Sequence, residues 1–253
     1  MVIFSFSPYE AYYYTLAIDS VLHNKIHFQK DTFPEFSFFA NNQFLVKSNE
    51  SRLALRNGQV IFYYKKELSE YKNQLDSTAG LLVEDFRSQE HRKSQLICPH
   101  NNYLLHNNEH LVTPLGDLSA DGSIFYFTNK KSDSITFYNM QNGQAVNYPI
   151  GGSQHTVFDS TKYGDIDYLM SYAFDNDINF KILPNADGCF LIKRLKNDQQ
   201  QKVYEIIHYN NSGEPDKKQT LTNNHLNITL SFLVDEKIYI PVSGTNYLLC
   251  LSY

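Results

Sequence analysis

The chain has 253 residues, a formal net charge of −5 and an aromatic content of 15%, which comes from Tyr and Phe alone because Trp is absent. Tyr and Phe suit pleated, half-buried strands better than helices, so the composition favours a β-rich protein. A net negative charge without a basic cluster argues against binding to nucleic-acid phosphates.

The N-terminal stretch MVIFSFSPYEAYYYTLAIDS lacks the basic region and the long apolar run of a secretory signal. No window of the sequence holds the ~18–20 apolar residues that a membrane-spanning helix needs. The three cysteines, Cys98, Cys189 and Cys250, lie far apart, which is typical of reduced thiols. We therefore expect a cytoplasmic protein that binds neither membrane nor nucleic acid.

The first group of expected strands lies in Phe36–Tyr64, where β-prone runs flank the Asn-Gly turn pair at 57–58. Residues 67–92 are the least β-like part of the chain. Apolar side chains recur there at helical spacing, which predicts a short helical insertion packed outside the sheets. The residues that carry this spacing are Leu68, Tyr71 and Leu75.

The segment CPHNNYLLHNNEH, Cys98–His110, collects one cysteine and three histidines. Structural zinc takes four such ligands in a tetrahedral array. The Cys-x-His spacing does not match a zinc knuckle, and the neighbouring residues favour a strand and a turn. We therefore predict no metal at Cys98, His100, His106 and His110.

The most regular stretch, Leu118–Ile150, predicts a three-stranded antiparallel meander. The Asp-Gly pair at 121–122 favours a turn, because Gly accepts a positive φ and Asp bonds its own backbone. The runs SIFYFTN and ITFYNM follow as strands. The Asn-Gly pair at 142–143 then predicts a two-residue hairpin, and QAVNYPI ends the group with Pro149 at a sheet edge.

The same order of strands and turns recurs twice toward the C-terminus. Phe180–Leu221 has turn pairs at 187–188 and 212–213, and the shorter copy Leu230–Tyr253 has Asp-Glu at 235–236. The turns at Asp187 and Asp235 are 48 residues apart, close to the ~40–50 residues of a propeller blade. The turns at Asp121 and Asp187 are 66 residues apart, which predicts an insertion between these two units.

The stretch HLVTPLGDLSADGSIFYFTNKKSDSITFYNMQNGQAV resembles one blade of a WD-repeat β-propeller. His110 stands where the family has a histidine at the start of the blade, and LSADG matches its turn. Tyr138 and Asn139 occupy the place of the Trp-Asp dipeptide, which departs from the family pattern but not from blade geometry. The resemblance is weaker over Phe180–Leu221, and it implies a fold without assigning any chemistry.

These patterns predict a single all-β domain over residues 1–253, built as a β-propeller-like series of antiparallel meanders. We expect the N-terminal run MVIFSFS to supply the outer strand of the last copy and so close the ring, because closure removes exposed sheet edges. The alternative fold is a β-sandwich of two meanders, in which the repeats are unrelated hairpins.

The insertion FDSTKYGDIDYLMSYAFDNDINF, Phe158–Phe180, is rich in Asp and Tyr. It lacks the Gly and the Glu of a calcium-binding EF-hand loop, so no metal is predicted. An acidic loop with interleaved tyrosines is typical of a recognition surface. The predicted partner-binding residues are Asp159, Tyr163, Asp165, Asp167, Tyr168, Asp175 and Asp177.

Motifs of the common enzyme classes are missing from the sequence: it has no GxSxG, P-loop, GxGxxG or HExxH. Ser153, His155 and Asp159 offer the residue types of a catalytic triad, but triads are defined by convergent geometry and not by proximity in sequence. We therefore predict a protein-binding module without catalytic residues, metal or cofactor.

The expected partner is another protein. One specific form of this hypothesis is an inhibitor or immunity-type protein that neutralises a toxic enzyme by direct binding, steered by its negative charge. The alternative hypothesis is a propeller hydrolase or lyase that acts on a small or sugar-like substrate at a central channel.

Overall fold

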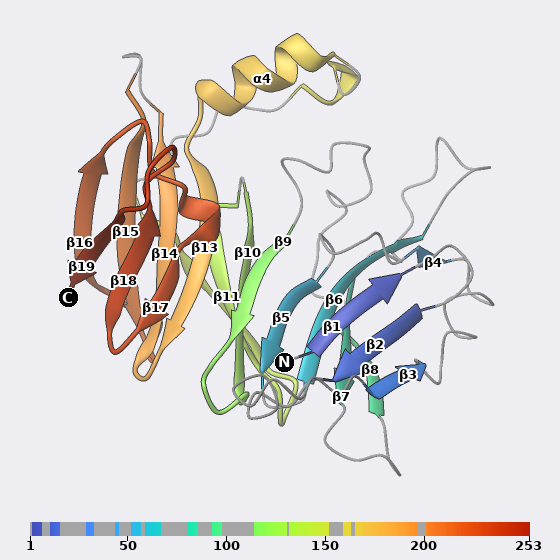
Figure 1. Ribbon diagram of the computed structural model, residues 1–253. Helices are drawn as coiled ribbons and strands as arrows, with labels where there is room; N and C mark the ends of the chain where they lie inside the picture. Colours follow the sequence, from blue (N-terminus) through green and yellow to red (C-terminus); the bar gives the residue numbers. More distant parts are fainter. Residues whose placement is uncertain are drawn as a thin grey trace.

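The protein is built from antiparallel β-sheets that follow one another along the chain, as the computed structural model shows in Figure 1. The structure describes residues 2–6, 11–15, 29–32, 44–45, 52–56, 59–66, 80–85, 93–97, 114–130, 132–151, 159–162, 165–196 and 201–253.

Two sheets come from the N-terminal part of the chain. The first has the order β1-β2-β3, formed by β1 (Val2–Phe6), β2 (Ala11–Thr15) and β3 (Gln29–Thr32). The second has the order β4-β6-β7-β8, with β5 also paired to β6. Its strands are β4 (Phe44–Leu45), β5 (Arg52–Arg56), β6 (Gln59–Lys66), β7 (Gly80–Asp85) and β8 (Lys93–Ile97).

Three further sheets follow, each a meander of consecutive strands. The third sheet comprises β9 (Pro114–Leu118), β10 (Ile124–Asn129), β11 (Ser134–Asn139) and β12 (Ala145–Pro149). The fourth comprises β13 (Ile178–Asn185), β14 (Gly188–Leu195), β15 (Val203–Asn210) and β16 (Pro215–Thr222). The last comprises β17 (Phe232–Val234), β18 (Lys237–Pro241) and β19 (Leu248–Ser252).

Little of the described chain is helical. Helix α4 (Ile166–Phe174) and the 3-10 turn η3 (Ser160–Lys162) lie between β12 and β13, and η4 (Ile228–Leu230) precedes β17.

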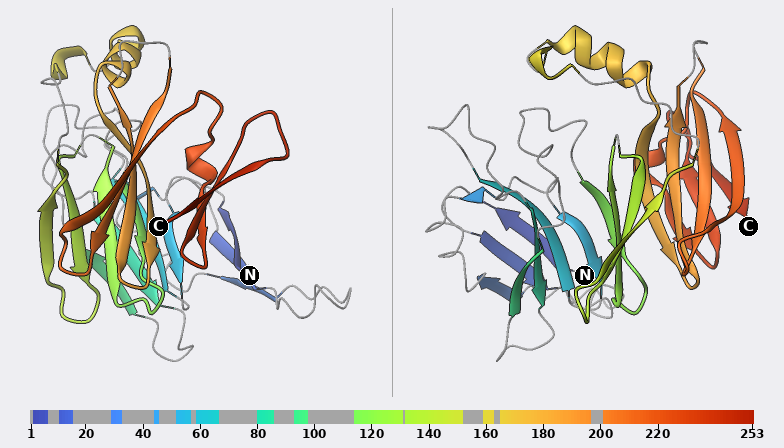
Figure 2. Two further views of the ribbon diagram at one scale, coloured as in Figure 1. Left: turned by 90° about the vertical axis from the view of Figure 1, so that its left-hand side faces the viewer. Right: turned by 180° about the vertical axis from the view of Figure 1, so that it is seen from behind.

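From the second sheet onward, neighbouring sheets contact each other through a strand at or near the start of each sheet. Strand β5 lies beside β9, β9 beside β13, and β13 beside β17, so the sheets form a row in chain order (Figures 1 and 2). This is the predicted propeller-like series of meanders. A two-sheet sandwich does not describe it, because the described strands form five sheets.

The fourth sheet is covered on both faces, so β14 and β15 are buried along most of their length instead of at alternate residues. One face carries Leu191 and Ile207 into a core shared with Tyr126 of the third sheet. The other face carries Ile192 into a core shared with Ile238 of the last sheet. Successive side chains of one strand therefore bind two different neighbouring sheets together.

The turn signals of the sequence are confirmed at most positions. Gly122 precedes β10 with a φ of 74°, and Gly188 begins β14 with a φ of 152°. Pro149 lies in the edge strand β12. The connection at 142–143 is longer than predicted: the Asn139 N–H donates to the Gln144 carbonyl at 2.8 Å, which leaves four residues in the loop. The Asn139 side chain favours this longer turn by accepting from the backbone of residues 141 and 142.

One expectation for the N-terminal part needs correction, and a second lies largely outside the described residues. Strand β1 does not complete the last sheet; it pairs with β2, with Val2 opposite Thr15, and lies at the other end of the row from β19 (Figure 1). Pairing with a near neighbour in sequence closes a much shorter loop, which costs less entropy. The predicted helical insertion 67–92 contains strand β7, while Leu68, Tyr71 and Leu75 lie outside the described residues.

The predicted hairpin in Phe36–Tyr64 is present, since β5 and β6 pair with Arg56 opposite Gln59.

Candidate functional site

The insertion between β12 and β13 forms helix α4, which stands beyond the ends of the sheets (Figures 1 and 2). The sequence predicted a loop here, and the correction has a local cause. Asp165 is an N-cap: its carboxylate accepts from the Tyr168 N–H at 3.0 Å, which satisfies a backbone donor that the first turn leaves unpaired. The following residues IDYLMSYAF then continue as helix.

The predicted partner-binding residues fall at different depths along this insertion. Asp167 and Asp175 are exposed, and Asp175 accepts from the Ser171 hydroxyl at 3.2 Å. Asp159 is half-buried and accepts from the backbone and hydroxyl of Thr161, bonds that lower the pKa of its carboxyl. Tyr163 lies outside the described residues.

Helix α4 has an inner and an outer apolar stripe, each with the four-residue spacing of one helix face. Tyr168 and Tyr172 form the inner stripe; Tyr172 is buried against Ile178, and the Tyr168 hydroxyl accepts from the Asp159 backbone at 2.8 Å. Met170 and Phe174 form the outer stripe, with 54% and 57% of their surface exposed.

Asp177 does not belong to the exposed surface, which corrects its predicted role. It is 4% exposed and forms an ion pair with Lys193, 3.6 Å from its Nζ. Lys193 is itself 1% exposed; its Nζ also lies 3.1 Å from Glu205 and donates to the Gly151 carbonyl at 3.2 Å. One buried lysine thus holds both ends of the insertion, Gly151 before it and Asp177 after it.

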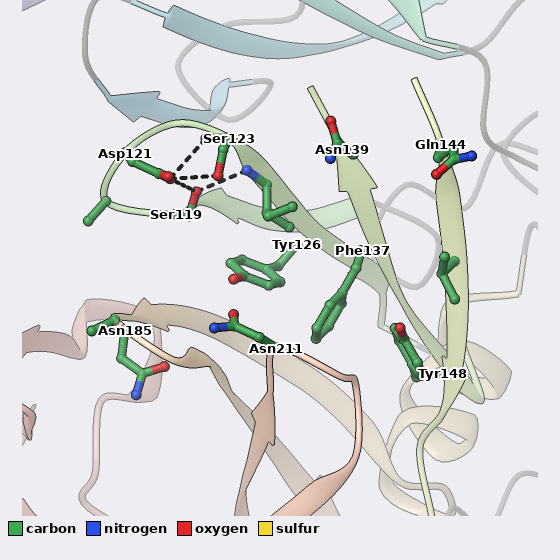
Figure 3. Close-up of a pocket in the computed structure, with 14 residues that line it drawn as sticks. Ser119, Asp121, Ser123, Tyr126, Phe137, Asn139, Gln144, Tyr148, Asn185 and Asn211 are labelled. Atoms are coloured by element: carbon green, nitrogen blue, oxygen red, sulfur yellow. Dashed lines mark hydrogen bonds between the residues drawn. The ribbon is translucent and has the colours of Figure 1, made fainter. Parts of the chain in front are cut away.

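A second candidate is a pocket between the third and fourth sheets, at the end where their turns gather (Figure 3). Its volume is about 580 Å³. The β9–β10, β11–β12, β13–β14 and β15–β16 connections contribute to its rim, and the rings of β10, β11 and β12 to its floor. The lining residues are Ser119, Ala120, Asp121, Ser123, Ile124, Tyr126, Phe137, Asn139, Gln144, Val146, Tyr148, Asn185, Ala186 and Asn211.

The carboxylate of Asp121 is held at the rim of this pocket. It accepts from the Ser119 hydroxyl at 2.6 Å, and from the backbone N–H and the hydroxyl of Ser123 at 3.0 and 2.8 Å. These bonds, the one from Ser119 first, lower the pKa of Asp121 to about 2. The rim therefore carries a fixed negative charge at neutral pH.

The wall opposite Asp121 is fixed by a buried histidine. His208 Nδ1 lies 2.6 Å from Asp216, and its Nε2 lies 3.2 Å from the side-chain oxygen of Asn185. The Asn185 amide nitrogen donates to Asp187. The orientation of the Asn185 amide is therefore set before any ligand arrives.

Sequence reasoning missed this pocket. Its rim combines turns that are distant in sequence, so no motif of neighbouring residues marks it. The repeated meander was the feature that could have predicted it. Two meanders that lie side by side in the same orientation place their first and third turns at the same end, where Asp, Asn and Ser side chains are then close together.

Among the described residues, no three His, Cys, Asp or Glu side chains lie close enough together to share a metal ion. The cluster Cys98–His110 and the residues Ser153 and His155 lie outside the described residues. No helix in the described part of the chain is long and apolar enough to cross a membrane.

Comparison with solved structures supports the fold. A member of the DUF4221 family from Bacteroides vulgatus matches with a TM-score of 0.53 and 11% identity, over 74% of this chain and 56% of that chain. This chain thus spans little more than half the length of that structure. At this identity the similarity shows a shared fold and gives no information about activity.

Two further structures match at lower TM-scores. A subtype N10 neuraminidase-like protein of A/little yellow-shouldered bat has a TM-score of 0.39 and 10% identity, over 78% of this chain and 51% of that one. A chain of a nidogen/laminin complex has a TM-score of 0.35 and 10% identity, over 99% and 88%. No protein-family model matches the sequence, and no curated protein is similar to it.

Proposed function

We propose that this chain is a non-enzymatic protein-binding module and that helix α4, with the acidic residues around it, is its binding surface. The observation that carries the proposal is the outer stripe of α4. Met170 and Phe174 are more than half exposed, on a helix that stands beyond the ends of the sheets (Figure 2). Large apolar side chains held in this way are typical of a helix that docks in a partner's groove.

The charge around this stripe defines the chemistry of the partner. Within the described residues of 159–175, the acidic side chains are Asp159, Asp165, Asp167 and Asp175, and the basic one is Lys162. Arg194 of β14 adds a second positive charge, 5.2 Å from the centre of the Phe174 ring, so acidic side chains still predominate. A complementary partner therefore has an apolar groove with a basic rim. Opposite charges across such a rim accelerate association and exclude acidic competitors.

The contacts of Lys193 with Asp177 and Gly151 support the same proposal. Because Lys193 holds Gly151 and Asp177 together, both ends of the insertion are fixed to the fourth sheet. A helix that is anchored before binding loses less conformational entropy when a partner docks.

A more specific form of the proposal is an inhibitor or immunity-type protein that blocks a toxic enzyme in the cytoplasm by direct binding. The net charge of −5 supports this form, since it favours a basic target. The relation to WD-repeat propellers over residues 110–150 is also part of the proposal, with His110 and the LSADG turn as its support.

The proposal is tested by capture from extracts of the native cells with the immobilised chain, followed by titration of the purified partner. We expect one stoichiometric partner for the wild type. Met170→Asp should weaken its binding by about tenfold or more, because it places a charge in an apolar contact.

The matched control is Leu230→Asp, which changes an exposed apolar residue away from α4 and should bind like the wild type. Absence of a stoichiometric partner, or equal affinity for Met170→Asp and the wild type, would contradict the proposal.

A further inference from the structure

The pocket between the third and fourth sheets is lined by the side chain of Tyr126, from strand β10. Tyr126 is 2% exposed, and burial raises the pKa of its phenol. The side chain lines the pocket, so its hydroxyl is placed to meet a ligand there. A phenol hydroxyl can both donate to and accept from a ligand that enters the pocket.

Other polar groups around Tyr126 are also available for a ligand. The Asn211 side chain faces the Tyr126 and Phe137 rings across the pocket (Figure 3) and makes no hydrogen bond to a described residue. Gln144 and Tyr148 also line the pocket and carry an amide and a hydroxyl. Amides and hydroxyls both donate and accept, so they match a ligand that carries several hydroxyl groups.

The floor of the pocket is a row of aromatic rings. Phe137 lies between Tyr126 and Tyr148, with ring centroids 4.7 and 4.8 Å away, each in an edge-to-face arrangement. Such a floor accepts the apolar face of a ligand, while the amides at the rim fix its orientation. This division between an apolar floor and a few convergent polar groups is typical of small-molecule sites.

The charge of the lining selects among polar ligands. Among the described residues that line the pocket there is no Lys, Arg or His, so none of them neutralises an anion. The carboxylate of Asp121 stays ionised and repels one, and its Oδ1 already accepts from Ser119 and Ser123. An uncharged ligand avoids both the repulsion and the need for a counter-charge.

We propose that this pocket binds a neutral saccharide of one or two rings, with Tyr126 and Asn211 bonding its hydroxyl groups and Phe137 packing on its apolar face. The volume of about 580 Å³ is within the range of ~300–1,000 Å³ that small-molecule sites occupy. The site is separate from helix α4 and does not depend on the proposed protein-binding function.

The experiment is saturation-transfer NMR on the full chain with D-glucose, D-galactose and N-acetyl-D-glucosamine as neutral probes. D-glucuronate and choline serve as anionic and cationic comparators. At least one neutral probe should bind, and D-glucuronate should bind more weakly than D-glucose. Tyr126→Phe should weaken the binding by about five- to tenfold through loss of one hydrogen bond.

Two further variants keep the test independent of folding. Asn211 lies on an exposed turn, and Asn211→Trp should abolish the saturation-transfer signal by filling the pocket. Tyr253→Phe removes a buried hydroxyl without a hydrogen-bond partner, on a residue that does not belong to the pocket lining, and should bind like the wild type. The proposal is overturned if no neutral probe binds, if choline alone binds, or if Asn211→Trp binds as well as the wild type.

Discussion

Single side chains decide the geometry of the turns around the pocket. Asp121 illustrates this: one carboxylate oxygen accepts from two serines and so closes the β9–β10 connection. The folded-state pKa is about 2, below the ordinary value of 3.8. The ionised carboxylate therefore stabilises the fold above about pH 4, and this stabilisation is lost as the pH falls through the folded-state pKa.

Removal of the Ser119 hydroxyl tests this assignment. In Ser119→Ala we expect the pKa of Asp121 to rise toward its ordinary value, because the bond from Ser119 is the largest cause of the shift. The loss of stability on acidification should then begin at higher pH. Carboxyl-carbon NMR titration measures the pKa, with Ser252→Ala, on an exposed residue of β19, as control. An unchanged Asp121 titration in Ser119→Ala would contradict the assignment.

Two glycines with the same backbone conformation separate backbone strain from packing. Gly213 and Gly244 have φ of 76° and 77°, but a Cβ on Gly213 would overlap the Tyr148 ring, whereas a Cβ on Gly244 meets nothing within 4 Å. Both alanine variants should lose ~1–2 kcal/mol from the positive φ. Gly213→Ala should lose ~1–3 kcal/mol more through overpacking.

Chemical denaturation of both variants measures this difference in the free energy of unfolding. In a double-mutant cycle, Tyr148→Ala should recover the extra loss in Gly213→Ala and leave Gly244→Ala unchanged. Equal losses for the two glycine variants would show that the Tyr148 ring moves aside without cost.

At the scale of elements, the anchor of helix α4 is the ion cluster beneath it. Lys193→Met leaves Asp177 and Glu205 buried without their shared cation, although Lys218 still contacts Glu205 at 2.6 Å. Breaking a buried pair costs ~3–5 kcal/mol. Hydrogen exchange should also accelerate in α4, because the end of its insertion is released.

Lys217→Met is the matched control, since Lys217 is exposed on β16. It should change the free energy of unfolding by less than ~0.5 kcal/mol. If both lysine variants had equal stability and equal exchange in α4, the cluster would not anchor the helix.

The elements also show what a single sequence reveals. Strands β10–β15 were predictable because Asp-Gly and Ser-Gly turns are local signals, read within a few residues. Helix α4 was missed because its acidic composition outweighed two clear signals, the N-cap at Asp165 and the four-residue spacing of Tyr168 and Tyr172. The role of Asp177 was not predictable, because its partner Lys193 lies on another strand.

At the scale of the whole molecule, long-range placement limits prediction from sequence. The sequence supports a series of meanders, since each is a local unit, but strand β1 was assigned to the wrong sheet. The pocket illustrates the same limit. Tyr126 and Asn211 line one pocket only because the third and fourth sheets pack against each other, and no local pattern encodes that packing.

The two cores of the fourth sheet make the C-terminal sheets one cooperative unit. Leu191 and Ile192 are adjacent in β14 but belong to different cores, one shared with the third sheet and one with the last. Leu191→Ala and Ile192→Ala should each lose ~2–5 kcal/mol. Both should lower the midpoint of the same single unfolding transition, because either core holds β14 in place.

Thermal denaturation followed by circular dichroism and by tyrosine fluorescence distinguishes a single cooperative transition from independent unfolding of the last sheet. Val146 is 47% exposed, so Val146→Ala should leave the midpoint of the unfolding transition unchanged. If Ile192→Ala lowered only part of the signal while the rest kept the wild-type midpoint, the last sheet would unfold separately. Coincident shifts in both probes would instead mean that the pocket and the anchor of α4 persist only while the whole stack of sheets is folded.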